Sequence, residues 1–349
     1  RQRLACNPHI RRKAGYVFKG TSVTPTPAKI AAVVVTFNRR DALEITLARL
    51  EHEAVDHIIV VDNASSDGTA AWLATLTNPR IDTVLLSDNL GGAGGFEAGL
   101  KHAPQTHDPD WTVLMDDDAR PQRGALAEFR TQIAKTDSHT GKYGAVAAAV
   151  FYPDGRLCEM NRPSRNPFWN LRLFAKTLLR GTRAGFHLTN DDFAPDAPVM
   201  QIDVASFVGY FVSRAAVTRI GLPEGGLFIY GDDVLYSLRL RRAGIGMVFM
   251  PAVRFEHDCA TIGEGFVYRP LWKIYYHCRN GVSIARQAAG PVIFPLALAY
   301  YTLIWWRRQR SYTPTEQKLY RKMMWAGLRD GFLSKRGRND AIHALASGN

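Results

Sequence analysis

The alternation of short apolar runs with segments at helical spacing constrains the fold of this chain more than any other feature. Three apolar runs cover residues 30–35, 57–61 and 81–86. Leu43, Leu47 and Leu50 follow the first run at helical spacing, a helix-like segment follows the second, and a glycine-rich loop and another helix follow the third. This alternation predicts an α/β domain with a largely parallel sheet and helices on both faces. We expect further strands at 111–115, 143–150, 199–212 and 246–250.

The sequence pattern divides the chain into three parts. These are a flanking segment at 1–28, an α/β domain at 29–280 and a basic, aromatic helical region at 281–349. The net charge is +12, and much of the excess lies between residues 307 and 338. Such a balance favours an anionic partner surface. No nucleic-acid recognition motif accompanies the charge, so we expect no nucleic-acid partner and keep an anionic membrane surface as the expectation.

The four cysteines are Cys6, Cys158, Cys259 and Cys278. They form no CxxC pair and no regular spacing, so the sequence predicts neither a zinc site nor a disulfide framework. A reducing cytosolic compartment fits this pattern. No secretory signal is recognised at the N-terminus, although the sequence begins at Arg1 without a methionine.

Two acidic clusters are the candidate centres of chemistry. Asp116, Asp117 and Asp118 follow the apolar run 111–115, where an α/β sheet binds its ligands. On an extended chain the first and third carboxylates share one side, which suits Mg²⁺ or Mn²⁺; a solvated acidic turn is the alternative. Asp232 and Asp233 precede a helical pattern, where one aspartate could cap the helix and the other could act as a base.

Polar residues at the ends of the expected strands are candidate donor-binding groups. Thr36, Asn38 and Arg39 follow the first strand, and Asp62 and Asn63 follow the second. Such side chains can bind a nucleotide, but they are also common turn formers and helix caps. The segment 89–96 has four glycines that permit close approach of a ligand, yet it lacks the dinucleotide-binding and Walker patterns. A lone His257, after the strand at 246–250, is more often structural than a ligand.

In order and spacing, these motifs resemble the bacterial inverting glycosyltransferases of family 2 over about residues 30–260. The motifs are VVVTFNR at 33–39, VVDNASSDGT at 60–69, NLGGAGGF at 89–96, MDDD at 115–118 and GDD at 231–233. Within the family, they look most like the galactofuranosyltransferases, with rhamnosyltransferases as close relatives. The resemblance implies a GT-A fold, a Rossmann-like mixed sheet flanked by helices, together with a nucleotide-diphosphate sugar donor and a divalent cation, Mn²⁺ or Mg²⁺.

The resemblance also implies roles for individual residues. Donor-binding positions are Thr36, Asn38, Arg39, Asp62 and Asn63 for the nucleoside, Asn89, Gly91 and Gly92 for the diphosphate or sugar, and Asp117 near the sugar. Metal-binding positions are Asp116, Asp118 and His257. Asp233 falls at the position of the catalytic base, and Asp232 beside it would position donor or acceptor hydroxyls. Gly231 stands where a tryptophan precedes the paired acids in one galactofuranosyl pattern, which leaves acceptor recognition open.

The expected activity is therefore inverting, metal-dependent transfer of a sugar, galactofuranose from its UDP donor, to a glycan or lipid-linked glycan of the cell envelope. The alternatives are a dTDP-rhamnose donor, a nucleotidyltransferase and a non-catalytic carbohydrate-binding scaffold. The uncharged segment 287–306 is long enough to span a bilayer, but Pro291 and Pro295 favour an interfacial element or a helical cap. We expect a cytoplasmic enzyme attached peripherally to the inner face of the membrane.

Overall fold

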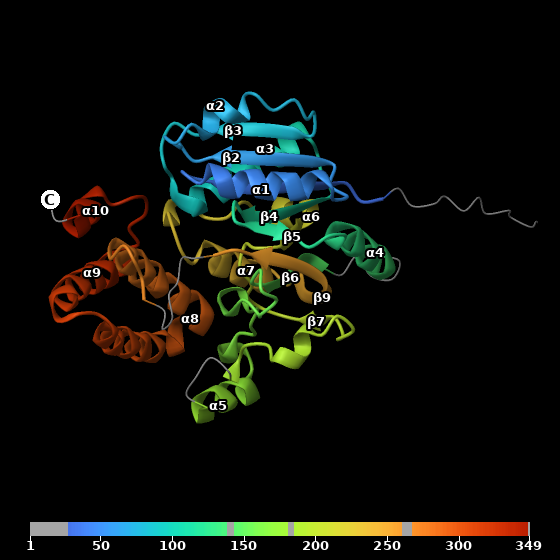
Figure 1. Cartoon of the computed structure of the whole chain (residues 1–349). Coiled ribbons are helices and arrows are strands. Elements are labelled where there is room, and N and C mark those ends of the chain that lie inside the picture. Colours follow the sequence, from blue (N-terminus) through green and yellow to red (C-terminus); the bar gives the residue numbers. More distant parts are fainter. Residues whose placement is uncertain (1–26, 138–142, 181–184, 260–266, 348–349) are drawn as a thin grey trace, which may run out of the picture.

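The computed structural model describes residues 27–137, 143–180, 185–259 and 267–347, and it places one nine-stranded sheet at the centre (Figure 1). The expected flanking segment 1–28 lies almost wholly outside the described residues. The strand order is β3-β2-β1-β4-β8-β6-β9-β5, and β7 pairs with β9. The strands are β1 (Ile30–Thr36), β2 (His57–Asp62), β3 (Ile81–Leu85), β4 (Trp111–Asp116), β5 (Ala119–Pro121), β6 (Tyr143–Phe151), β7 (Met200–Gln201), β8 (Tyr210–Ser213) and β9 (Gly246–His257).

Only one half of the sheet has the predicted parallel arrangement. Strands β3, β2, β1 and β4 are parallel neighbours, as the repeated strand and helix pattern indicates. Beyond β4 the sheet is mixed, because β8 runs antiparallel to both β4 and β6, and β5 and β7 run antiparallel to β9. The prediction of a largely parallel sheet is therefore wrong for this half. The sheet as a whole is therefore mixed, as the resemblance to GT-A enzymes implies.

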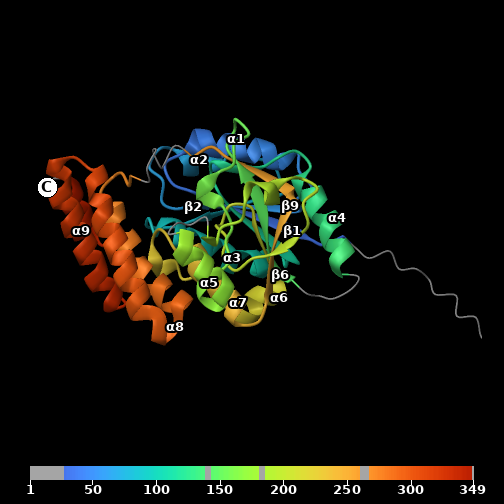
Figure 2. The same ribbon diagram turned by 90° about the horizontal axis from the view of Figure 1, so that it is seen from below.

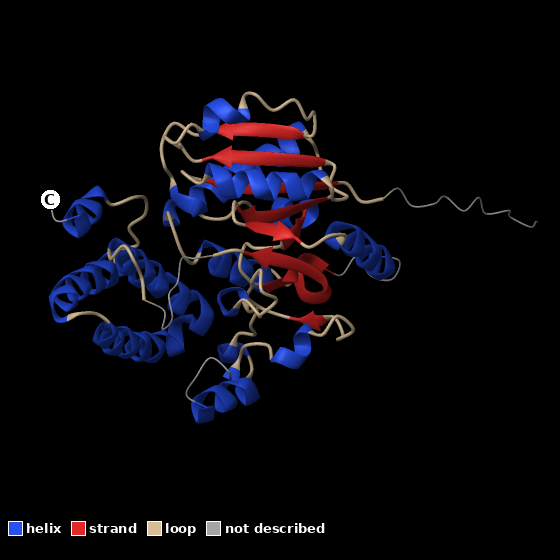
Figure 3. Ribbon diagram, viewed as in Figure 1, coloured by secondary structure: helices blue, strands red, loops and turns tan. Residues whose placement is uncertain are grey.

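Helices cover both faces of the sheet (Figure 3). Their bounds are α1 (Arg40–Glu51), α2 (Thr69–Leu73), α3 (Gly91–Thr106), α4 (Ala125–Asp137), α5 (Leu171–Arg180), α6 (Arg214–Ile220) and α7 (Asp232–Arg242). Alternate residues of β1 divide between two cores: Ile30, Ala32 and Val34 pack with α1 and α4, and Ala31, Val33 and Val35 pack with α3. Both faces are apolar because both are covered. Short 3-10 turns lie at Glu159–Asn161, Pro167–Trp169, Asn190–Phe193, Gly225–Leu227 and Gln309–Ser311.

The glycine-rich segment lies in a helix, so the predicted glycine-rich loop is wrong. Helix α3 begins at Gly91 and presents its glycines to the strand and loop beneath it. A Cβ added at Gly95 would lie 2.4 Å from the Val35 side chain, and one at Gly91 would lie 1.9 Å from the carbonyl oxygen of Phe228. Close helix packing explains these glycines without a ligand. Gly92 differs, because nothing lies within 4 Å of its added Cβ.

The C-terminal region is a helical group beside the sheet domain, made of α8 (Trp272–Arg308), α9 (Pro314–Phe332) and α10 (Asp340–Ser347) (Figure 2). We expected this region to start at residue 281, but α8 begins at Trp272 and continues past that boundary. Gly290, with φ 72° and ψ 173°, interrupts α8 just before Pro291. The first half of α8 packs between the sheet domain and α9, where Gly327 and Gly331 lie against its backbone, and the second half also contacts α9, around Leu298 and Trp305.

Two buried side chains of α8 hold the loop that leads into α7. The Asn280 amide lies within hydrogen-bond distance of three carbonyl oxygens, those of Leu227 (3.1 Å), Ile229 (2.9 Å) and Tyr230 (2.8 Å). Arg279 donates to the Leu227 carbonyl at 2.7 Å. The loop needs this support because Phe228 (φ 67°) and Tyr230 (φ 68°) have left-handed backbone angles that cost bulky residues about 1–3 kcal/mol each. The start of α8 thus belongs to the unit that positions Asp232 and Asp233.

We expect Asn280→Asp to lower the free energy of unfolding by about 2–3 kcal/mol, because it turns a carboxylate toward carbonyl oxygens in place of an amide donor. Urea denaturation measures this change. Asn170→Asp is the matched control: this exposed residue only accepts a hydrogen bond from the Leu173 amide, a role that aspartate fills equally well. Equal stability of the two variants would contradict the role given to Asn280.

Candidate functional site

The acidic cluster lies at the carboxyl edge of the parallel strands. In the sheet register Val35 of β1 faces Asp116 of β4, and Thr36 of β1 faces Asp62 of β2. The ends of three neighbouring strands therefore meet here, as the sequence pattern predicts. Asp117 and Asp118 follow β4 and are buried, each 3% exposed. Carboxylates buried to this extent require compensating charge or hydrogen bonds.

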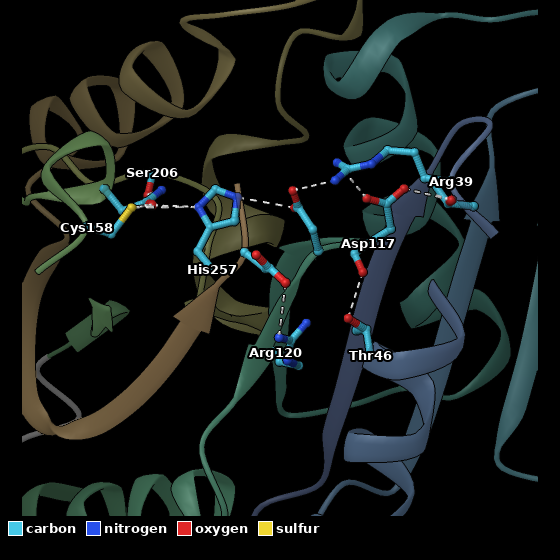
Figure 4. Close-up of polar contacts among 11 residues, drawn as sticks. Arg39, Thr46, Asp117, Arg120, Cys158, Ser206 and His257 are labelled. Carbon is cyan, nitrogen blue, oxygen red and sulfur yellow. Dashed lines mark hydrogen bonds and ion pairs between the residues drawn. The ribbon is translucent and has the colours of Figure 1, made fainter. Parts of the chain in front are cut away.

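Arg39 and Thr36 supply part of that compensation (Figure 4). The Arg39 guanidinium lies 3.1 Å from Asp117 and 2.8 Å from Asp118. Thr36 Oγ1 donates to the other oxygen of Asp117 at 2.8 Å. Asp117 thus contacts β1 and is not in the group that Asp116 and Asp118 form with His257, as the predicted alternation of the triple aspartate implies. Arg39 lies in the loop that we expected to bind the donor, and its side chain forms ion pairs with these two carboxylates.

Asp116, Asp118 and His257 form a group of donors in which one atom of each lies within 4.8 Å of the others. His257 is the last residue of β9, a strand that extends beyond the predicted 246–250 and pairs His257 with Ala119 of β5. This pairing explains how a residue so distant in sequence reaches the triple aspartate. Of the described residues, Asp118 Oδ1 is a buried oxygen without an aligned donor, although His257 Nε2 lies 3.2 Å away. Two carboxylates and one imidazole with such an oxygen suit Mn²⁺ or Mg²⁺.

The imidazole of His257 is oriented by a residue that the sequence did not reveal. Its Nδ1 lies 2.7 Å from Asn161 Oδ1, which can only accept, so Nδ1 carries a proton and Nε2 faces the carboxylates. The Asn161 amide nitrogen in turn donates to Ser206 Oγ at 2.8 Å. Histidine ligands of metals are commonly held in this way. Asn161 ends the short 3-10 turn Glu159–Asn161, in a stretch of sequence without motif or period, so no signal in the sequence marks it.

Burial and nearby charges shift the pKa values of the residues in this cluster. Burial, with the adjacent charge of Asp118, raises the pKa of Asp116 to about 7. Burial raises the pKa of Asp117 to about 6 against the effect of Arg39. For His257, burial favours the neutral ring, but the nearby charge of Asp118 and other contacts outweigh it and raise the pKa to about 10. The carboxylates therefore strongly favour a cation between them and His257.

Asp232 and Asp233 begin α7, and neither serves as its N-cap. That position belongs to Gly231, whose φ of 84° suits glycine. Burial and the neighbouring Asp233 raise the pKa of Asp232 well above its usual value, whereas burial raises that of Asp233 only to about 6. Asp233 is therefore the more readily ionised of the two acids, and Asp232 holds a proton more readily. Asp233 is also the more exposed of the two.

The other predicted donor-binding residues brace the loops after β1 and β2. The Asn63 amide donates to Asn89 Oδ1 at 3.2 Å, and Asn63 Oδ1 accepts from the Leu90 amide at 2.8 Å. Asp62 accepts from the Ser65 amide at 3.1 Å, and Asn38 Oδ1 accepts from the Ser66 amide at 2.7 Å. The turn-forming alternative is therefore realised for these residues, and donor binding remains a separate prediction. Asn38 and Arg39 also line a surface hollow with Arg40, Asp41, Ala42, Glu44 and Asp67.

A mixed sheet that carries a triple aspartate at its carboxyl edge defines a GT-A glycosyltransferase domain, and the comparisons agree. The glycosyl transferase family 2 model matches residues 31–186. The galactofuranosyltransferase GlfT1 of Mycolicibacterium smegmatis is 31% identical over 238 residues, which cover 66% of this chain and 72% of that protein. The chain belongs to glycosyltransferase family 2 and is a glycosyltransferase.

One further relative and one solved structure show how far the similarity extends. GlfT2 of Mycolicibacterium smegmatis is 25% identical over 301 residues, which cover 77% of this chain but only 42% of that protein. Among solved structures, residues 1–349 of S. aureus TarS in complex with UDP-GlcNAc match with a TM-score of 0.52 at 14% identity. That match covers 91% of this chain and 83% of the solved chain, and it establishes the fold.

We expect Asn161→Leu to weaken Mn²⁺ binding about 10–100-fold, because leucine keeps the volume but removes the acceptor that orients His257. Electron paramagnetic resonance of free Mn²⁺ measures the affinity without turnover. Ser206→Ala is the graded control: it removes a partner of the Asn161 amide nitrogen but leaves Oδ1, so its effect should be smaller. Wild-type Mn²⁺ affinity in a folded Asn161→Leu protein would argue against this role of Asn161.

Proposed function

We propose that this glycosyltransferase moves galactofuranose from UDP-galactofuranose to a glycan or lipid-linked glycan acceptor, with inversion at the anomeric carbon. The observation that carries the proposal is the pairing of two acidic centres with different charge states. One, formed by Asp116, Asp118 and His257, suits a divalent cation. The other, Asp232 and Asp233, retains one ionised carboxylate at neutral pH. The 31% identity to a galactofuranosyltransferase supports the choice of sugar.

In this proposal the donor binds along the carboxyl edge of β1, β2 and β4. The loops with Thr36, Asn38, Asp62 and Asn63 hold the nucleoside, and the start of α3, with Asn89, Gly91 and Gly92, lies along the diphosphate or sugar. Asp116, Asp118 and His257 would hold Mn²⁺ or Mg²⁺, which neutralises charge on the leaving diphosphate. Asp117 lies near the sugar. Arg39, which is partly exposed, can turn from Asp117 and Asp118 toward the diphosphate once a cation balances these carboxylates.

The acceptor hydroxyl is activated by Asp233. Its carboxylate accepts the hydroxyl proton while the oxygen attacks the anomeric carbon from the face opposite the diphosphate, so one displacement inverts that carbon. The pKa of Asp232 is raised further by burial and by Asp233, so Asp232 would be the acid that donates a hydrogen bond and positions a sugar hydroxyl. The Val234 amide donates to Asp233 Oδ1 at 2.7 Å, which leaves the other oxygen for the substrate. The difference in pKa between the two acids supports this division of roles.

The direct test supplies UDP-galactofuranose and dTDP-rhamnose, with Mn²⁺ or a chelator, to the purified protein with an acceptor glycan. We expect metal-dependent release of UDP and inverted product from the first donor. Preference for dTDP-rhamnose would reassign the sugar to rhamnose. Release of pyrophosphate would indicate a nucleotidyltransferase. Metal-dependent donor binding without any product would leave only a carbohydrate-binding scaffold.

We expect Asp233→Asn to lower kcat by about 10²–10⁴-fold while the affinity for UDP, measured by calorimetry, stays close to wild type. In the wild type, kcat/KM should fall as the pH drops below about 6, because a base must be unprotonated and the pKa of Asp233 is about 6. Saturating Mn²⁺ keeps the protonation of Asp116 out of this profile. A wild-type rate in Asp233→Asn would exclude Asp233 as the base.

We also propose that α8 and α9 attach the enzyme to an anionic membrane surface. Of the described residues, one segment, Trp272–Ser311, is long and apolar enough to cross a membrane. Its second half, however, buries one side against α9 and exposes the other, where Val292 (86% exposed), Leu296 (74%), Tyr300, Leu303 and Trp306 recur at helical spacing. A one-sided apolar face suits interfacial attachment better than a span.

The charge around this apolar face is complementary to anionic lipid. Trp306 lies beside the exposed Trp325 of α9, with ring centroids 6.3 Å apart, so α9 continues the same surface. Exposed basic residues near it are Arg307, Arg310, Lys318 and Lys322. The acids of α9 are neutralised within the protein, since Glu316 pairs with Arg269 and Asp330 pairs with Arg329 and Lys335. Each basic residue near an anionic surface contributes about 1 kcal/mol of attraction.

We expect the protein to sediment with vesicles that contain phosphatidylglycerol and only weakly with neutral vesicles. The double variant Val292→Glu and Leu296→Glu should lower the partition coefficient at least about tenfold, because it removes two side chains worth about 1.5–3 kcal/mol each when buried. Ile45→Glu on α1 is the control, since Ile45 is 54% exposed on another helix. Equal loss in the two proteins, or no binding by the wild type, would refute this attachment.

A further inference from the structure

Two thiols lie on the side of His257 that faces away from Asp116 and Asp118. Cys158 is 2% exposed and follows β6, and Cys259 is partly exposed and lies two positions after His257. One donor atom from each of Cys158, His257 and Cys259 lies within 4.8 Å of the other two. No pattern in the sequence indicates this cluster, because Cys158 and His257 are 99 positions apart and no CxxC motif is present.

We propose that Cys158, Cys259 and His257 Nδ1 form a second metal site, selective for thiophilic ions such as Zn²⁺. Two thiolates and an imidazole are the donors that such ions prefer, whereas Mn²⁺ and Mg²⁺ prefer oxygen. Cys158 Sγ lies 4.0 Å from His257 Nδ1. Zinc bonds of about 2.3 Å to sulfur and 2.0 Å to nitrogen together exceed that separation, so one ion can reach both atoms.

A fourth donor already lies in the cluster. Asn161 Oδ1 is 2.9 Å from Cys158 Sγ and 2.7 Å from His257 Nδ1. With protons on the thiol and on Nδ1, this oxygen accepts two hydrogen bonds. When the ion binds, the two thiols and Nδ1 release their protons to solvent, and the carbonyl oxygen faces the ion. The same four groups therefore have a hydrogen-bonded state and a metal-bound state.

The shared imidazole couples this site to the metal site of the proposed function, on which the coupling rests. A neutral imidazole has one lone pair, so it can ligate through Nδ1 or Nε2 but not both. An ion at the thiols takes Nδ1, which moves the ring proton to Nε2, where it points at Asp118. His257 is then lost as a ligand for Mn²⁺. Zinc bound to the thiols is thus an inhibitor that acts by changing the tautomer of His257.

The first experiment uses Co²⁺ as a spectroscopic substitute for Zn²⁺ on the reduced protein. We expect thiolate-to-cobalt charge-transfer absorption and the visible bands of tetrahedral Co²⁺, both displaced by Zn²⁺. Cys259→Ser and Cys158→Ser should each remove the charge-transfer intensity of one thiolate. Cys278→Ser is the control, because Cys278 is buried in the separate helical core and should leave the spectrum unchanged. A spectrum without thiolate bands would overturn the proposal.

The second experiment measures the Kd of Mn²⁺ by electron paramagnetic resonance with and without one equivalent of Zn²⁺. The wild type should show a Kd raised at least about tenfold by Zn²⁺, the scale of losing the correct orientation of a histidine ligand. In Cys259→Ser and Cys158→Ser this ratio should fall toward one. An undiminished ratio in both variants would overturn the coupling, because it would mean that Zn²⁺ competes directly at Asp116 and Asp118.

These readouts separate this inference from the proposed function. If the wild type binds Co²⁺ with thiolate bands but never binds Mn²⁺, the thiol site is correct and the proposed oxygen-rich site is wrong. If Mn²⁺ binds and no thiolate band develops, the proposed function retains its metal and the second site does not exist. Far-UV circular dichroism of each variant identifies misfolding, and the partly exposed Cys259 offers the milder substitution.

Discussion

The concentration of negative charge at one buried edge is the constraint on which the rest of this structure depends. Asp116, Asp117 and Asp118 lie together where β4 ends, and such a cluster would repel itself without compensation. The fold meets it from two sides, with Arg39 from the loop after β1 and His257 from the end of β9. The strand order brings both to one place. The site is therefore a consequence of sheet topology and charge balance together.

The helical region contributes to this site although it lies outside the sheet. Asn280 and Arg279 of α8 hold the left-handed loop before α7, and that loop delivers Asp232 and Asp233. The start of α3 contacts the same loop, since the Ala93 amide donates to the Phe228 carbonyl at 3.1 Å. The proposed membrane-binding face belongs to the second half of the same α8 helix. One helix thus joins the support of the proposed catalytic pair to the surface that we propose meets a lipid-linked acceptor.

Local patterns in the sequence were sufficient for the parallel strands and for the acidic edge, because apolar runs and strand ends are properties of neighbouring residues. They were insufficient wherever a distant partner decides the outcome. The glycines at 91–95 indicated a loop, yet their reason is the approach of Phe228 and Val35 to a helix. The cluster of Cys158, Asn161 and His257 depends on the pairing of β9 with β6 and β5, which no local spacing encodes. The role of His257 came from family resemblance, and Asn161 was missed altogether.

Both acidic centres bring buried carboxylates close together, and each therefore favours a positive charge beside them: a metal ion at the first and a proton at the second. At Asp116 and Asp118, the two carboxylates and the imidazole suit a metal ion; at Asp232 and Asp233, burial raises both pKa values and so favours a proton. The centres also affect one another, because the charge of Asp116 contributes to the raised pKa of Asp232. A divalent ion at Asp116 would offset that repulsion and lower the pKa of Asp232. In the proposed mechanism, binding of the donor with its metal would therefore also change the charge balance of the second acidic pair.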